Sequence, residues 1–128
     1  MFSTQIALMY KGELILGVSN SPMFQEMAWA EKGCGAFMND KPIQVSDIEA
    51  LDLCALSTGN IATLAATPSW DGLSELIRSV SRIRGYGDFF HYHLLASGKI
   101  DIIVESDVNI LDIAALSVII NEAGGVFT

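Results

Sequence analysis

The sequence predicts an α/β fold in which a short antiparallel meander is followed by alternating strands and helices. Residues 1–46 contain short extended segments separated by turns rich in Gly, Asn and Pro. Residues 47–128 contain apolar runs of strand length that alternate with segments of helical periodicity. Apolar residues make up 51% of the 128 residues, which is enough to form the core of one compact domain.

The first 46 residues predict the meander. Residues 5–10 and 13–18 flank Lys11-Gly12, which is typical of a tight hairpin. The following segments alternate between turn and strand composition: a turn at 19–22, a strand at 27–31, a Gly-rich turn at 32–35, a strand at 36–38, a turn at 39–42 and an extended segment at 43–45.

The later residues predict a layered sheet. Residues 52–57 form an apolar run, typical of a buried strand, that ends at Thr58-Gly59-Asn60. Residues 69–82 predict a helix capped by Ser69. The remaining segments continue the alternation: a strand or turn at 84–87, a helix at 88–97 that ends at Gly98, a strand at 99–105, a helix at 111–123 that ends at Gly124-Gly125, and the start of a strand at 126–128. Such alternation predicts a functional site at the strand ends.

Both ends of the sequence fall in predicted strands. Met1 lies at the start of one strand, and Thr128 lies just inside another. A domain that begins and ends inside its sheet would leave open edges. We therefore expect residues 1–128 to form one partial domain of a longer protein, with antiparallel strands in 1–46 and an α/β part in 47–128.

The charge balance excludes some partners. Seven Lys and Arg residues stand against fifteen Asp and Glu residues, which gives a formal charge of −8. The basic residues are scattered, so the sequence lacks the basic surface that a nucleic-acid-binding protein needs. No apolar run reaches the roughly 18 residues of a membrane span, and no signal peptide is recognisable, so we expect no membrane partner.

The cysteines and histidines do not predict a metal site. Cys34 and Cys54 lack metal-ligand spacing, and we expect two small apolar core residues in a reducing, cytoplasmic compartment. His91 and His93 are two positions apart on a predicted helix, so they point to different faces and cannot share one metal ion. We expect both histidines at the edge of the core or on the surface.

Carboxylates at strand ends and helix starts are the main chemical feature. Glu105 ends a predicted strand, and Asp112 lies in the first turn of the next helix. The helix dipole favours the ionised carboxylate that a Mg²⁺ ligand needs. Asp112 could instead simply accept hydrogen bonds from the helix N-terminal amides. The apolar segment after Asp112 favours the functional interpretation, because an idle charge in buried surroundings is costly.

The segment Arg84-Gly85-Tyr86-Gly87-Asp88 has two interpretations. It can be a glycine turn in which Asp88 is the N-cap of a helix. It can also form one wall of a substrate pocket, with Arg84 and Asp88 facing a polar ligand.

Residues 89–128 resemble the C-terminal signature of the inositol monophosphatase family. The family's W-D-x-A-A helix start corresponds to Leu111-Asp112-Ile113-Ala114-Ala115, and its E-A-G-G helix end corresponds to Glu122-Ala123-Gly124-Gly125. The segments TQIALMYKGELILGVSNSP and GCGAFMNDKPIQVS are similar to the strands that follow the family's first metal-binding motif. R-G-Y-G-D-F with L-L-A-x-G is most similar to the histidinol-phosphate phosphatase branch.

The resemblance implies the C-terminal part of a layered α/β/α sandwich, in which residues 1–46 complete an N-terminal subdomain that is otherwise missing. It implies that Asp112 is a Mg²⁺ ligand. It also implies that Glu105, Gly87 and Asp88 contact the polar or cationic tail of a small phosphorylated metabolite, with Arg84 nearby. The longer protein would be a homodimer.

The sequence departs from the family pattern at two places. Leu111 replaces the usual Trp, which changes the expected packing. The family's upstream Glu and its D-P-[IL]-D-G-T motif, which supply the other metal ligands and a Thr that positions the attacking water, are absent. The resemblance therefore implies metal-assisted hydrolysis without a covalent enzyme intermediate, but no complete catalytic set in residues 1–128.

Three functions remain open from the sequence. The first is hydrolysis of histidinol phosphate, for which an acidic pair suits the amino and imidazole groups. The second is hydrolysis of inositol phosphate or another small phosphate ester by the same family site. The third is a non-catalytic binding or assembly module that keeps the family's sheet.

Overall fold

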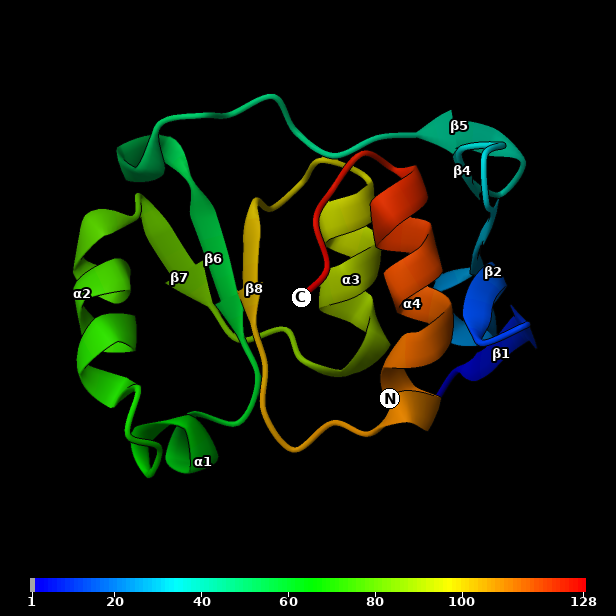
Figure 1. Ribbon diagram of the computed structural model, residues 1–128. Helices are drawn as coiled ribbons and strands as arrows, with labels where there is room; N and C mark the ends of the chain where they lie inside the picture. The colour runs from blue at the N-terminus through cyan, green and yellow to red at the C-terminus, as the bar shows by residue number, and fades with distance from the viewer. Residues whose placement is uncertain (1) are drawn as a thin grey trace.

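The computed structural model describes residues 2–128, which form two sheets and two groups of helices (Figure 1). The antiparallel sheet has the strand order β1-β2-β3-β4-β5 and the parallel sheet has the order β7-β6-β8. Eight strands make up the sheets: β1 (Thr4–Tyr10), β2 (Glu13–Ser21), β3 (Glu26–Glu31), β4 (Ala36–Met38), β5 (Lys41–Ile43), β6 (Ala55–Thr58), β7 (Arg82–Arg84) and β8 (Ile102–Val104). The α-helices are α1 (Ile61–Ala65), α2 (Trp70–Ser79), α3 (Asp88–Ala96) and α4 (Ile110–Glu122).

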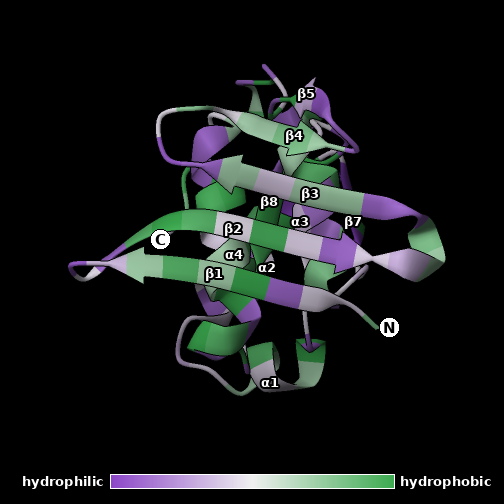
Figure 2. Ribbon diagram, turned by 90° about the vertical axis from the view of Figure 1, so that its right-hand side faces the viewer, coloured by the Kyte–Doolittle hydropathy of each residue, from purple (hydrophilic) through white to green (hydrophobic). Residues whose placement is uncertain are grey.

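The predicted α/β class is confirmed. Figure 1 shows α3 and α4 between the two sheets, with α2 beside β7 on the far side of the parallel sheet. The parallel sheet therefore lies between helices, as the expected α/β/α arrangement requires, and the antiparallel sheet adds a further layer. Figure 2 shows that sheet from its outer side, with α3 and α4 behind it.

The β1–β2 hairpin follows from its turn residues. Lys11 and Gly12 have φ angles of 50° and 81°, and two successive positive φ values are what a two-residue hairpin turn requires. The structure corrects the turn expected at 19–22, because β2 continues to Ser21. Ser19 pairs with Gln5 of β1 on one side and with Ala28 of β3 on the other. Pairing on both edges overrides the polar composition of this segment.

Three predicted elements in the later half were too long. The strand expected at 99–105 is β8, which spans only Ile102–Val104. β6 begins at Ala55 and not at Asp52, because Leu51–Leu53 form a 3₁₀ turn. α2 ends at Ser79, because Arg82–Arg84 form β7 and pair in parallel with β6. Ser69 precedes α2, but its side chain makes no capping hydrogen bond.

Two other elements also differ from the predictions. α1 was not predicted; Asn60 caps it by accepting a hydrogen bond from Ala62 N at 3.1 Å. The strand expected to begin at 126–128 is not formed in the structure, where these residues are irregular.

The core lies where α3 and α4 meet the sheets. Its buried side chains come from β3, β4, α3, α4 and the residue that follows α4. They are Ala28, Ala30, Ala36, Phe89, Tyr92, Ala96, Leu116, Val118, Ile119, Ile120 and Ala123. α4 lies so close to β2 that a Cβ atom at Gly17 would overlap the backbone carbonyl of Ala115. A glycine is required here by space, because any side chain would push the helix off the sheet.

The outer strand β1 exposes several large apolar side chains, among them Ile6 (56% exposed) and Tyr10 (60% exposed). The cysteines only partly follow the prediction, because Cys54 is buried but Cys34 is exposed in the β3–β4 turn. Within residues 2–128, no helix has the length and apolarity that crossing a bilayer demands.

We predict that Gly17→Ala destabilises the fold by about 3 kcal/mol or more, because the added methyl meets rigid backbone. Urea denaturation measures the change in the free energy of unfolding. Gly72→Ala is the matched control: no atom lies within 4 Å of its added Cβ, and α2 should gain about 0.5–1 kcal/mol. Equal stability of the two variants would contradict the close α4–β2 contact.

Candidate functional site

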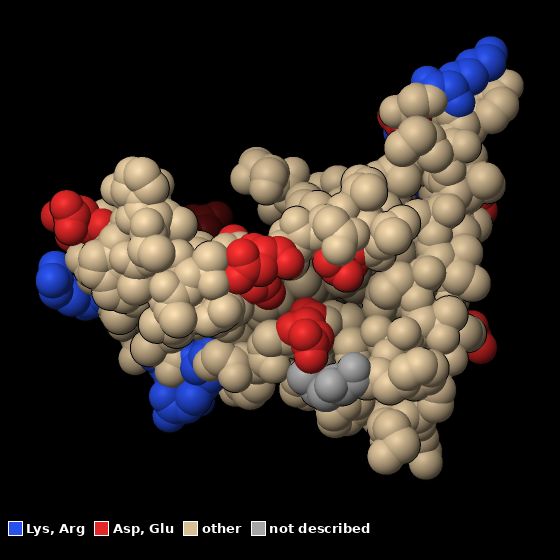
Figure 3. Space-filling view, turned by 90° about the horizontal axis from the view of Figure 1, so that it is seen from below, with Lys and Arg blue, Asp and Glu red and all other residues tan. Residues whose placement is uncertain are grey.

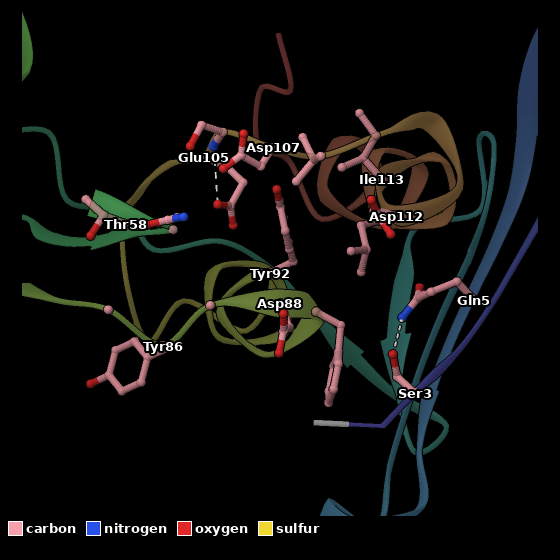
Figure 4. A pocket seen from close by; sticks show the side chains of 18 of the residues that line it. Ser3, Gln5, Thr58, Tyr86, Asp88, Tyr92, Glu105, Asp107, Asp112 and Ile113 are labelled. Carbon is pink, nitrogen blue, oxygen red and sulfur yellow. Dashed lines mark hydrogen bonds between the residues drawn. The ribbon is translucent and has the colours of Figure 1, made fainter. Parts of the chain in front are cut away.

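A pocket of about 580 Å³ lies where the carboxyl ends of β6 and β8 meet the first turns of α3 and α4. Ligands bind at such strand ends in parallel sheets. Polar residues lining the pocket come from β1 and the residue before it, from the end of β6, from the loops before α1, α3 and α4, and from α3 and α4 themselves. They are Ser3, Gln5, Thr58, Asn60, Tyr86, Asp88, Tyr92, Glu105, Ser106, Asp107 and Asp112. Figure 4 shows how the side chains of Asp88, Glu105, Asp107 and Asp112 are grouped around this space.

The pocket is acidic. Four carboxylates line it, and none of the described residues in its wall is Lys or Arg. Figure 3 shows acidic side chains around a hollow on this face of the molecule. Carboxylates that lie close together repel one another, so the site suits a ligand or ion that carries positive charge.

The structure brings together four of the five sequence-predicted site residues: Gly87, Asp88, Glu105 and Asp112. The fifth, Arg84, is exposed and does not line this pocket. Its guanidinium Nη1 donates to the backbone oxygen of Ile83 at 2.7 Å. The alternative in which Asp88 is the N-cap is wrong, because Gly87 holds that position with φ 70° and Asp88 is the first helical residue.

Asp112 combines a capping role with exposure to the pocket. Its Oδ2 accepts a hydrogen bond from Asn109 N at 2.9 Å, while Asn109 Oδ1 accepts one from Leu111 N at 2.8 Å. The expectation of buried surroundings is wrong, because Asp112 is exposed. The capping box uses one carboxylate oxygen, and Oδ1 makes no hydrogen bond with the described residues.

Glu105 lies in the opposite wall, close to a buried histidine. Its side chain is 12% exposed, and its Oε2 lies 2.9 Å from Nε2 of His91, whose side chain is fully buried. The two atoms are not aligned as a hydrogen bond, so the contact is an electrostatic approach. Burial raises the pKa of Glu105, the Ser106 N–H opposes this rise, and the negative charges of Asp88 and Asp107 add to it.

Burial keeps His91 neutral. It lowers the pKa of His91 to about 4, although the negative charge of Asp88 acts in the opposite direction. On its other side, Nδ1 lies 3.1 Å from Ser57 Oγ in β6. The sequence placed this histidine at the core edge or on the surface, which is wrong, because the helix that carries it is enclosed between the sheets.

His93 is also buried, and it joins α3 to the antiparallel sheet. Its Nε2 lies 2.7 Å from Ser19 Oγ, and its Nδ1 lies 3.0 Å from Glu26 Oε2. Gln5 donates to the same Ser19 Oγ at 2.8 Å and reaches the pocket wall. Sequence analysis missed Gln5 as a pocket residue. Its polar side chain within an otherwise apolar strand was the available signal.

Comparisons with known proteins identify the family of this chain. The sequence profile of the inositol monophosphatase family matches residues 1–128. The chain belongs to the inositol monophosphatase family. It is 35% identical to a histidinol-phosphatase of Mycobacterium tuberculosis, over 100% of this chain and 51% of the relative.

Two further relatives have other names. A fructose-1,6-bisphosphatase/inositol-1-monophosphatase of Thermotoga maritima is 34% identical over 99% of this chain and 48% of its own length. The structure of an inositol monophosphatase from Zymomonas mobilis superposes with a TM-score of 0.87 at 30% identity, over 96% of this chain and 48% of that one. The chain thus spans about half the length of the relatives that it matches.

Members of the inositol monophosphatase family are metal-dependent phosphatases. The donor chemistry of the pocket fits a hard cation, because all four acidic side chains offer oxygen ligands. Asp112 can offer Oδ1, which makes no hydrogen bond with the described residues. Within residues 2–128, however, no three His, Cys, Asp or Glu side chains are arranged to hold a metal ion together.

We predict that acid destabilises the fold through His91. Its pKa is about 4 when folded and roughly 6.5 when unfolded, so the unfolded state binds more protons between these values. The contribution of neutral His91 to the free energy of unfolding is fully present above pH 6.5. It falls by about 3 kcal/mol as the pH drops to 4. Burial also lowers the pKa of His93, which adds to the loss, whereas the raised pKa of Glu105 opposes it.

Urea denaturation at several pH values measures this loss, with His91→Gln as the comparison because glutamine does not titrate. The variant should lose distinctly less stability between pH 6.5 and pH 4 than the parent chain. Identical pH profiles would show that His91 is not buried in its neutral form.

Proposed function

We propose that this chain forms the C-terminal part of a Mg²⁺-dependent phosphate monoesterase that hydrolyses L-histidinol phosphate to L-histidinol and phosphate. The observation that carries the proposal is the acidic pocket, which is lined by carboxylates from the end of β8, the loop that follows it and the first turns of α3 and α4. Membership in a phosphatase family supports the reaction class, and the relatives named histidinol-phosphatase support the substrate.

In this proposal Asp112 holds the metal through Oδ1, while Oδ2 keeps the first turn of α4 capped. The capping hydrogen bond fixes the direction of the carboxylate before any ion binds. Mg²⁺, when bound, would activate a water molecule, neutralise the phosphate charge and stabilise the leaving alkoxide. One aspartate holds Mg²⁺ poorly, so a site with activity needs carboxylates from residues outside this stretch.

The substrate tail would bind at the other wall. Asp88 and Glu105 present carboxylates to the amino and imidazole groups of histidinol, and Gly87 allows close backbone approach beside them. The aromatic ring of Tyr86, in the same wall, can stack on the imidazole. Arg84 does not line the pocket, and its guanidinium bonds to the backbone oxygen of Ile83, so a substrate contact from Arg84 would need a different side-chain conformation.

Inositol phosphate is the second candidate. Relatives named inositol-1-monophosphatase match almost the whole chain at 33% and 32% identity, and carboxylates accept hydrogen bonds from hydroxyl groups as well as from amines. A panel of L-histidinol phosphate, inositol 1-phosphate and a nucleotide monophosphate, assayed with a longer protein that carries this sequence, distinguishes the candidates. A preference for inositol phosphate in kcat/KM would overturn the substrate assignment.

We predict that residues 1–128 alone release no phosphate from L-histidinol phosphate with Mg²⁺, whereas a longer protein with the upstream metal ligands does. A malachite-green assay of inorganic phosphate measures both. Turnover by residues 1–128 alone would show that their own side chains complete the site. Absence of turnover by the longer protein on every ester of the panel would favour the non-catalytic module.

We predict that Asp112→Asn lowers kcat of the longer protein by at least about 100-fold, because the amide cannot replace the charged metal ligand. Asparagine keeps an oxygen that accepts the Asn109 N–H bond, so the helix cap survives. Thermal unfolding should therefore change little. Full activity in this variant would remove Asp112 from the metal site.

A further inference from the structure

The Glu105 carboxylate is held in one place by contacts from three directions. Ser106 N donates to its Oε1 at 3.2 Å, and His91 Nε2 approaches its Oε2 at 2.9 Å. On the third side it lies against the backbone of Gly59, directly after β6. A long side chain at a pocket wall normally samples several rotamers, so this enclosure needs a reason.

Gly59 makes room for the carboxylate. A Cβ atom at Gly59 would overlap Glu105 Oε1 and lie 2.9 Å from Oε2. The backbone of Gly59 is itself fixed, because its N–H donates to Val104 O at 3.0 Å across the sheet. Its φ is not positive, so no backbone conformation demands a glycine here. Space for Glu105 is the requirement that remains.

The hydrogen bonds behind His91 are compatible with a proton on Nε2, and the Glu105 carboxylate close to Nε2 favours that tautomer. Tyr86 N donates to Ser57 Oγ at 3.3 Å, so the Ser57 hydroxyl hydrogen is available for His91 Nδ1 at 3.1 Å. A neutral imidazole that accepts at Nδ1 carries its hydrogen on Nε2. This hydrogen is then on the side of Glu105 Oε2.

We propose that His91 and Gly59 are positioning residues that hold the Glu105 carboxylate at the pocket wall while leaving its charge available to a cationic group of the ligand. A protonated histidine or a lysine in this position would also fix the carboxylate, but it would compete with the ligand for the charge. A neutral imidazole, fully buried behind the wall, supplies a dipole without a net charge. The low pKa of His91, caused by burial, agrees with this role.

The role assigned to Glu105 rests on the proposed function, but its position can be tested without activity. In the chain labelled with ¹⁵N and ¹³C, the ring nitrogens of His91 report the tautomer and the Glu105 Cδ reports its carboxylate. We expect the Nε2–H tautomer of His91 at pH 7. The Nδ1–H tautomer, or an imidazolium, would overturn the proposal.

The substitution that tests Gly59 is Gly59→Ala, with Gly72→Ala as its matched control on an open face of α2. Gly59→Ala should shift the Glu105 Cδ resonance and its titration midpoint, while the rest of the ¹H–¹⁵N spectrum stays folded. Gly72→Ala should leave both unchanged. An unchanged Glu105 signal in Gly59→Ala would overturn the proposal.

Ligand binding tests the consequence, with L-histidinol as the probe in an NMR titration of the same chain. Loss of a charge-assisted contact is worth roughly 1.5–3 kcal/mol, so Gly59→Ala and His91→Leu should weaken binding at least about tenfold. His91→Gln keeps an N–H donor at the end of a side chain of similar length and should restore binding to within about threefold.

The outcomes separate the two proposals. If the parent chain does not bind L-histidinol, the substrate assignment fails, while the tautomer and the Glu105 resonance still decide the positioning roles. If His91→Leu does not fold, the Glu105 resonance in Gly59→Ala and the His91 tautomer in the parent chain decide the positioning roles. Binding that is equal in the parent chain, Gly59→Ala and His91→Leu would overturn the positioning roles even where L-histidinol binds.

Discussion

The close contact between α4 and β2 is the constraint on which the site depends. Gly17 has no side chain, so the backbone of α4 can lie directly on the antiparallel sheet at Ala115. This contact fixes the helix one turn after Asp112 and thereby places the capped carboxylate at the mouth of the pocket. α3 packs beside α4, so the start of α3, with Gly87 and Asp88, is positioned by the same layer.

The second constraint is electrostatic. The pocket gathers four carboxylates that repel one another, and burial together with the charges of Asp88 and Asp107 raises the pKa of Glu105. Backbone amides reduce this cost at two of the carboxylates, through the Asn109 N–H at Asp112 and the Ser106 N–H at Glu105. Neutral donors leave the charge of the site available for metal and substrate, whereas internal ion pairs would cancel it.

The sequence predicted most of the fold because local signals were strong. Lys11-Gly12 defined the hairpin, and the glycines at 98 and 124 ended the helices close to the observed residues. It failed where tertiary contacts decide: Ser19 lies in a strand because both neighbouring strands pair with it, and Asp52 lies outside β6 because a 3₁₀ turn precedes the sheet.

For the candidate site too, the sequence predicted what local signals determine and missed what tertiary contacts determine. Asp88, Glu105 and Asp112 stand out as carboxylates at element ends, and the fold brings all three to one pocket. Arg84 is only four residues from Asp88, yet the strand β7 directs it elsewhere. The roles of Gly59 and His91 could not be read from the sequence, because each depends on a contact with a residue far away along the chain.

The spacing of the two histidines of α3 correctly predicted that they lie on different faces of the helix. The expectation that they lie at the core edge or on the surface was wrong. Two positions along a helix place His91 and His93 on different faces. Because α3 lies between two sheets, both faces are buried, and each histidine contacts a different sheet. His91 lies against Ser57 of the parallel sheet, and His93 lies against Ser19 of the antiparallel sheet.

In both contacts a neutral imidazole meets a serine hydroxyl at one ring nitrogen. The other ring nitrogen faces a carboxylate, which is Glu105 for His91 and Glu26 for His93. The two contacts differ in the location of the carboxylate. Glu26 lies at the start of β3, at the sheet surface, and the Ser19 hydroxyl that contacts His93 also accepts a hydrogen bond from Gln5, which lines the pocket. Glu105 lines the pocket. The contacts of His91 with Ser57 and Glu105 therefore link the position of α3 on the parallel sheet to a side chain of the site. The same pair of groups, a neutral imidazole and a serine hydroxyl, therefore connects α3 to each sheet, and each pair contacts a residue that lines the pocket.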